Sequence, residues 1–267
     1  MKILSILIIL FFTTKPFAVL KLNEIPTLPY HLAVSMGKVA NARAIHGFFD
    51  CTTLTTTEKT VWDGPGVYVY PTAAVQMTVS SSSINDTAAG SGMRQVLIQG
   101  LDSNYNEISE TITLNGQTPV TTVNSYLRIQ GTGMRGSAAG ASGTNEGIIY
   151  IGVGAVAVGV PTTIYNLISI GDSSSHSGFF TIPAGNTGYF LEIQASSVSN
   201  KPLKMKGWHK NGNPVFFTFS GFHVDGVVTE QPKFVTVLEE KSDIEFRATM
   251  DAGTGEVFAH AHLLLIN

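Results

Sequence analysis

The segment that most constrains the fold is Met93–Val123, because it alternates short β-type runs with strong turn signals. Arg94–Gln99 and Ile108–Leu114 have the length and composition of strands, and Val120–Val123 is a third such run. Between the second and third runs, Asn115-Gly116 is a two-residue hairpin signal, since both residues tolerate the positive φ of a type I′ turn. The segment therefore predicts a three-stranded β-meander.

Short runs of the same kind recur along the rest of the chain. They follow one another at roughly 8- to 12-residue spacing, which is typical of β-sandwiches and jelly rolls. The clearest is Val257–Ile266, in which one face is uniformly apolar: Val257, Ala259, Ala261, Leu263 and Leu265. After residue 14 no segment of helical length shows a 3.6-residue period. The sequence therefore predicts an all-β protein with two β-sandwich or jelly-roll-like domains.

The expected domain limits follow the turn residues. Residues 26–160 are predicted to form an N-terminal β-sandwich domain, and residues 161–267 a C-terminal jelly-roll-like β domain, with the boundary near Pro161. Within the first, Tyr30–Phe49 is expected to form a strand, a turn and a second strand. The Ser-rich segment Ser80–Gly92 and the Gly-rich segment Gly131–Gly147 are expected to be loops that contact partners.

The first 25 residues lie outside this fold prediction. Lys2 followed by the ten-residue, mainly apolar run Ile3–Phe12 resembles a secretory signal ending near Ala18, and this run is too short to span a bilayer as a helix. The alternatives are an N-terminal arm or an over-extended start. If residues 1–18 are a true signal peptide, the protein is expected to be secreted.

Composition excludes several classes of function. A formal net charge of −3 and a pI near 6.1 leave no basic footprint for nucleic acid. Charged residues make up 13% of the chain, against roughly 25% in typical soluble domains. Such a low charge suits a surface partly covered by neighbouring subunits. The lone Cys51 excludes an intramolecular disulfide and a cysteine-based zinc cage.

No motif predicts catalysis or a cofactor. Gly152–Ala157 matches GxGxxA after a predicted strand, but Val158–Pro161 follows where a dinucleotide fold needs a helix. Ser173–Ser177 lacks the Gly-x-Ser-x-Gly pattern of a nucleophile elbow and is expected to be a loop. The acidic pair Glu239-Glu240 fits a solvated turn better than general acid–base catalysis. The chain is predicted not to be an enzyme and to have no catalytic residue and no cofactor.

His260 and His262 are the candidate metal ligands in the sequence. A period of two places both imidazoles on the polar side of the last strand, a spacing that supplies half of a metal site. His223 and Asp225 could complete such a site from neighbouring strands. A surface pair that faces solvent or a neighbouring subunit is the favoured interpretation, so no metal is predicted.

Several segments together resemble a family of virion structural proteins of marine tailed phages. The longest is SSSINDTAAGSGMRQVLIQGLDSNYNEISETITLNGQTPVTTVNSYLRI at residues 81–129, flanked in order by AIHGFFD at 44–50, WDGPGVYVYP at 62–71, FTIPAGNTGYF at 180–190 and EKSDIEFRATM at 240–250. The resemblance implies a capsid-associated, decoration or fibre-like β protein of the virion, without enzymatic activity.

The expected partners follow from that resemblance. They are other copies of the chain and other virion proteins, such as the major capsid protein or tail components, with no nucleic acid and no membrane for the folded part. A trimer is favoured, because low-charge β subunits of virion appendages need neighbours to cover their edges.

A secreted or surface glycan-binding β-sandwich is the alternative. Trp208, Tyr189 and Trp62 would then be the stacking platforms. The sequon at Asn85 would matter only on a eukaryotic secretory route.

Overall fold

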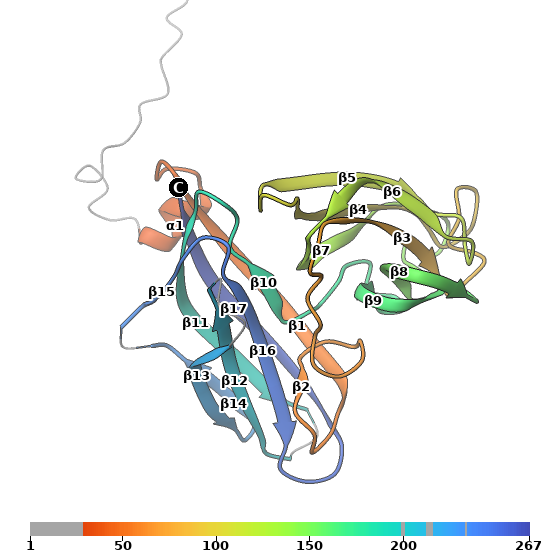
Figure 1. Ribbon diagram of the computed structural model, residues 1–267. Coiled ribbons are helices and arrows are strands. Elements are labelled where there is room, and N and C mark those ends of the chain that lie inside the picture. Colours follow the sequence, from red (N-terminus) through yellow and green to blue (C-terminus); the bar gives the residue numbers. More distant parts are fainter. Residues whose placement is uncertain (1–28, 199–200, 212–215, 233) are drawn as a thin grey trace, which may run out of the picture.

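The computed structural model describes residues 29–198, 201–211, 216–232 and 234–267, and it is almost entirely antiparallel β-structure (Figure 1). The segment 1–25, whether signal or arm, lies outside the described residues. The elements are α1 (Tyr30–Ser35), β1 (Ala42–Leu54), β2 (Lys59–Thr60), β3 (Val75–Ser81), β4 (Met93–Leu101), β5 (Glu107–Thr113), β6 (Val120–Tyr126), β7 (Arg128–Ala139), β8 (Ile149–Ala157), β9 (Val160–Ile168), β10 (Phe179–Thr181), β11 (Thr187–Ser197), β12 (Leu203–Lys210), β13 (Phe217–Val224), β14 (Val227–Glu230), β15 (Thr236–Leu238), β16 (Asp243–Met250) and β17 (Gly255–Ile266). The all-β prediction is confirmed.

Two sheets form what we call the larger sheet pair. One has the order β1-β17-β11-β14, with β15 also on β11, and the other has the order β10-β16-β12-β13, with β2 on β16. Their facing sides enclose one core, which includes Phe49, Phe190, Ile193, Phe246 and Leu263. The apolar face predicted for β17 is buried in this core at all five positions.

The smaller sheet pair consists of the sheets β6-β3-β8-β9 and β5-β4-β7. It encloses a separate core that includes Met77, Val96, Ile98, Tyr126 and Ile151. The loop joining β8 to β9 is a tight hairpin with Val158 and Gly159 at positive φ. No helix follows the GxGxxA segment, which lies within β8.

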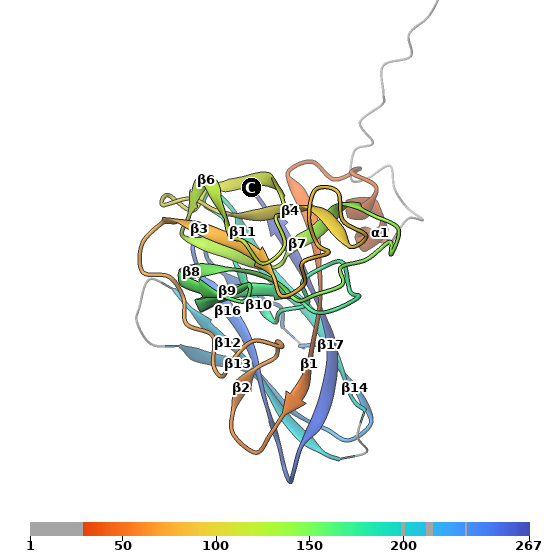
Figure 2. The same cartoon turned by 90° about the vertical axis from the view of Figure 1, so that its right-hand side faces the viewer.

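The two sheet pairs are not separated in the sequence at the expected boundary between residues 160 and 161. β1 pairs with β17, so that His46 lies opposite His262, and the two run side by side in Figure 2. β9, which spans the expected boundary, pairs with β8 of the smaller pair. Residues 75–168 therefore form the smaller sheet pair as an insertion between β2 and β10. Long-range pairing of this kind has no local sequence signature.

Two local predictions were wrong. Tyr30–Ser35 is a helix rather than a strand; it begins after Pro29, whose fixed φ suits a helix start, and it buries Ala33 and Val34. Six residues are too few to show a helical period. The segment after Gly131 is a strand up to Ala139, because glycines let β7 approach its neighbours. A Cβ on Gly133 would lie 2.4 Å from the Gln99 carbonyl oxygen.

The predicted meander is only partly present. β4 and β5 pair, but β6 turns away and pairs with β3 in the other sheet. Asn115-Gly116 is therefore not a hairpin turn: Gly116 alone has positive φ, and its N–H donates to the Asp86 carbonyl oxygen at 2.8 Å. Asp86 explains the change, since its buried carboxylate accepts hydrogen bonds from Ser81 and Met93 and holds the 82–92 loop against this turn.

A buried ion pair joins the two sheet pairs. Arg128 of β7 donates two hydrogen bonds to Asp243 of β16, at 2.8 and 2.9 Å, and its third nitrogen donates to the Pro71 carbonyl oxygen. Thr181 donates to the same carboxylate at 2.7 Å, and the Lys210 ammonium lies 3.3 Å from it.

Among the described residues, no helix is long and apolar enough to cross a membrane.

Candidate functional site

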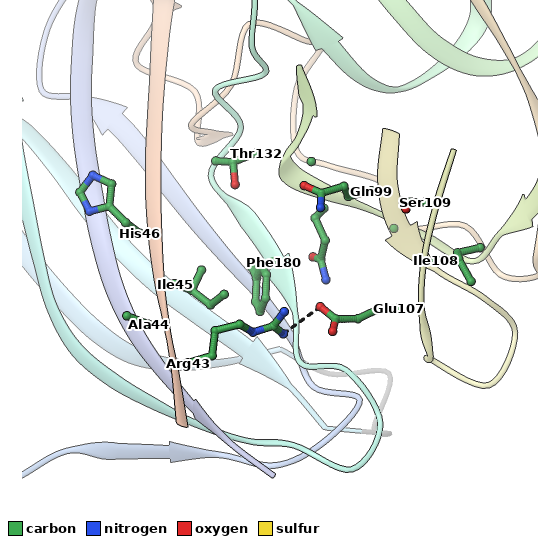
Figure 3. A pocket seen from close by; sticks show the side chains of 13 residues that line it. Arg43, Ala44, Ile45, His46, Gln99, Glu107, Ile108, Ser109, Thr132 and Phe180 are labelled. Atoms are coloured by element: carbon green, nitrogen blue, oxygen red, sulfur yellow. Dashed lines mark hydrogen bonds and ion pairs between the residues drawn. The ribbon is translucent and has the colours of Figure 1, made fainter. Parts of the chain in front are cut away.

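A cleft of about 390 Å³ opens between β1 of the larger sheet pair and β4, β5 and β7 of the smaller one (Figure 3). Arg43, Glu107, Gln99, Thr132 and Phe180 surround one space in this view. The two sheet pairs meet beside the cleft, where β7 contacts β1 and β10.

Strand alternation decides which side chains of β1 reach the cleft. Arg43 and Ile45 point to the cleft side, whereas His46 points to the other side of the strand (Figure 3). Across the cleft, Glu107 begins β5, and its carboxylate lies 2.8 Å from the Arg43 guanidinium. Both side chains are about half exposed (48% and 52%), so this ion pair bridges the cleft in contact with solvent.

The side chains of the deeper wall already make contacts within the protein. Gln130 is buried, and its amide both donates to and accepts from the Thr181 backbone, at 2.9 Å each. Phe180 is half-buried and packs on the larger core. The side chains of Gln99 and Thr132 make no hydrogen bond with any residue in the described part of the chain. They are the polar groups available to a ligand.

A second feature lies on the outer face of sheet β1-β17-β11-β14, the side turned away from the larger core. A hollow of about 640 Å³ there is lined by Ser35, His46, Leu191, Glu192, Gln231 and His262, among others. Alternation in β17 directs His260 and His262 to this face, as predicted, and the register with β1 adds His46. Sequence reasoning missed His46, because 216 residues separate it from His262.

The outer face carries a chain of hydrogen bonds across three strands. Glu192 lies 2.8 Å from His262 Nδ1, and His262 Nε2 is hydrogen-bonded to His46 Nδ1. The His260 ring centre lies 5.5 and 5.6 Å from the other two rings. Burial, followed by the neighbouring charges of His262 and His260, lowers the pKa of His46. The hydrogen bond from Gln231 contributes most to lowering the pKa of Glu192.

The structure does not add His223 or Asp225 to the histidines. His223 lies on β13 of the opposite sheet and contacts Asp251 at 2.7 Å. Within the described ranges, no group of three or more histidine, cysteine or acidic residues is arranged to hold a metal ion.

The three aromatic residues predicted as stacking platforms differ in how far they are exposed. Trp62 is only 1% exposed and packs against Tyr68 and Phe179, so its assignment as a platform was wrong. Trp208 is half-buried, with the cations of Lys206 and Arg247 over its ring. Tyr189 is half-buried and paired with Val237 across β11 and β15.

The Ser173–Ser177 loop forms an unexpected network with β1. Ser174 Oγ lies 3.0 Å from His176 Nε2, and His176 Nδ1 lies 3.3 Å from Asp50 and 3.6 Å from Asp172. Burial alone would lower the pKa of His176, but the hydrogen bond and charge of Asp50, followed by the charge of Asp172, raise it. The Asp50 N–H also donates to the His176 carbonyl oxygen at 3.3 Å, so the network ties the loop to β1.

Comparison with known proteins does not assign the chain to a family. No protein-family model matches the chain, and no curated protein matches it. Solved structures that resemble it include infectious bursal disease virus of the Gx strain, at 10% identity and a TM-score of 0.23, covering 89% of this chain and 76% of that one. T=1 particles derived from the same virus give 11% identity and a TM-score of 0.24, covering 84% and 69%. At such TM-scores the likeness carries no argument about fold or function. The resemblance to virion proteins of tailed phages stays an expectation.

Proposed function

We propose that the chain is a structural protein of a virion that acts by self-assembly and by binding other virion proteins, as a head decoration, neck or tail component. In this proposal the two sheet pairs are two β-sandwich domains, and the chain has no catalytic role. The sequence resemblance described above motivates the proposal. The observation that carries it is the apolar character of the outer face around the 640 Å³ hollow.

Large apolar side chains lie exposed on both sides of that hollow. Leu32 and Met36 belong to α1 and the turn after it, and are 42% and 54% exposed. Leu191 and Val237, on β11 and β15, are 37% and 55% exposed. Gathered apolar surface of this kind marks interaction sites. Its few charges suit contact with a second copy of the same chain, which meets no strong like-charge repulsion.

The molar mass of the purified protein, measured by light scattering after size exclusion, tests the proposal. We expect a closed oligomer, with three copies of the 28.5 kDa chain as the favoured assembly. Val237→Glu should dissociate it, because the substitution buries a charge in the contact. Val123→Glu is the matched control, since Val123 is 82% exposed on β6 of the smaller sheet pair. A monomer at every concentration, or equal behaviour of both variants, would contradict self-assembly through this face.

A further inference from the structure

We propose that the cleft between β1 and the β4–β5 hairpin binds an uncharged saccharide, one or two sugar units in length. This activity is independent of the virion role. The cleft volume of about 390 Å³ lies within the range of small-molecule sites, which gather where two structural units meet. Its lining combines polar side chains from four strands with one aromatic ring.

The charges at the cleft favour a neutral ligand. The guanidinium of Arg43 and the carboxylate of Glu107 lie 2.8 Å apart and compensate each other. A free anion at this place would meet Glu107, and a free cation would meet Arg43. Adjacent hydroxyls suit both groups, because a hydroxyl donates to a carboxylate and accepts from a guanidinium. Each group also remains half exposed, so neither must be uncovered before a ligand reaches it.

Uncommitted hydrogen-bonding groups lie beside this ion pair. Gln99 on β4 carries an amide that both donates and accepts, and Thr132 on β7 carries a hydroxyl. Both side chains point to the same space as Arg43 and Glu107 (Figure 3). Gln130 is less available, because its side chain is buried and its amide already donates to and accepts from the Thr181 backbone.

Phe180 supplies the apolar contact. Its ring is half-buried, rests on the larger core and lies between Ile45 and the polar groups of the cleft (Figure 3). A sugar ring presents C–H groups on its faces and hydroxyls on its rim. The cleft offers the matching arrangement, with an aromatic floor and polar walls. Trp62 is too deeply buried to offer such a floor.

Binding of neutral mono- and disaccharides to the full-length protein, measured by saturation-transfer NMR and titration, tests the inference. The panel should include glucose, galactose, mannose, N-acetylglucosamine and their disaccharides, with sialic acid as a charged comparison. Glu107→Gln and Gln99→Leu change exposed cleft side chains. Trp208→Phe is the control at the rival aromatic position. Thermal melting of each variant confirms folding.

We expect at least one neutral sugar to bind, and each cleft variant to weaken Kd about tenfold, the effect of removing one or two hydrogen bonds. Trp208→Phe should leave Kd unchanged. The inference is overturned if no neutral sugar binds, if sialic acid alone binds, or if Trp208→Phe weakens binding while the cleft variants do not. The molar mass of each variant, recorded separately, keeps this result distinct from the test of self-assembly.

Discussion

Asp243→Asn is expected to reduce the free energy of unfolding by about 3–5 kcal/mol, because it leaves Arg128 buried without its counter-charge. The side chains of Arg128 and Asp243 are only 6% and 2% exposed, so water cannot replace the lost partner. The carboxylate also accepts a hydrogen bond from Thr181 and lies near Lys210. An amide supplies one acceptor oxygen and no charge in place of two charged oxygens.

The chain contains a matched contrast for this experiment. Arg43 and Glu107 form an ion pair at the same 2.8 Å separation, but both side chains are about half exposed. Exposed pairs contribute about 0–1 kcal/mol, so Glu107→Gln should change stability by less than about 1 kcal/mol. Burial, together with the additional hydrogen bonds to Asp243, then accounts for the difference between the two substitutions.

Guanidinium chloride unfolding, followed by tryptophan fluorescence, measures both variants. Arg128→Met and the double variant complete a cycle that isolates the coupling between the two side chains. The double variant should be more stable than Asp243→Asn, since it removes the unpaired charge. A loss below about 1 kcal/mol for Asp243→Asn, or a double variant as unstable as the sum of the single ones, would refute the assignment of a desolvated pair.

Two further predictions concern titration and the thiol. The pKa of His46 is lowered, so its contribution to stability is full above about 6.5, the value in the unfolded chain, and is lost as pH falls through the lower folded pKa. The pKa of His176 is raised, so its contribution is full below about 6.5 and is lost as pH rises through the folded pKa. Denaturant unfolding between about pH 5 and pH 8 should therefore show His46→Gln gaining relative stability in acid and His176→Gln losing it; the reverse order would contradict the assigned neighbours. Cys51 is fully buried, so a thiol reagent should label it only after denaturant is added, and rapid labelling of the native protein would show that β1 opens.

The sequence was most informative where one strand carries its own pattern. The alternation of Val257–Ile266 identified β17 and its buried face, and it placed His260 and His262 on the opposite side. The same alternation in β16 puts Phe246 in the core. It does not reveal that Glu245 is also buried, because Thr60 and Arg247 cover that face with hydrogen bonds.

Features that depend on distant pairing were not predictable in this way. The cleft brings Arg43 to Glu107 across 64 positions, and the outer face brings His46 to His262 across 216. Neither pair has a local signal, because strand register is fixed by the whole sheet. Asp50 likewise meets His176 only because β1 passes the loop after β9. The candidate sites therefore depend on the register of β1 with distant strands, which the sequence does not reveal. The fold class depends on the local pattern of each strand, which the sequence does reveal.

The pairing of β1 with β17 also sets the order in which the protein can fold during synthesis. The strands of the smaller sheet pair are complete at Ile168, whereas β17 begins only at Gly255. At about 5–20 residues per second the ribosome needs roughly 4–17 s to reach β17. During that interval the nascent chain carries a finished small core, while the backbone N–H and C=O groups along the β17 edge of β1 wait without their partners.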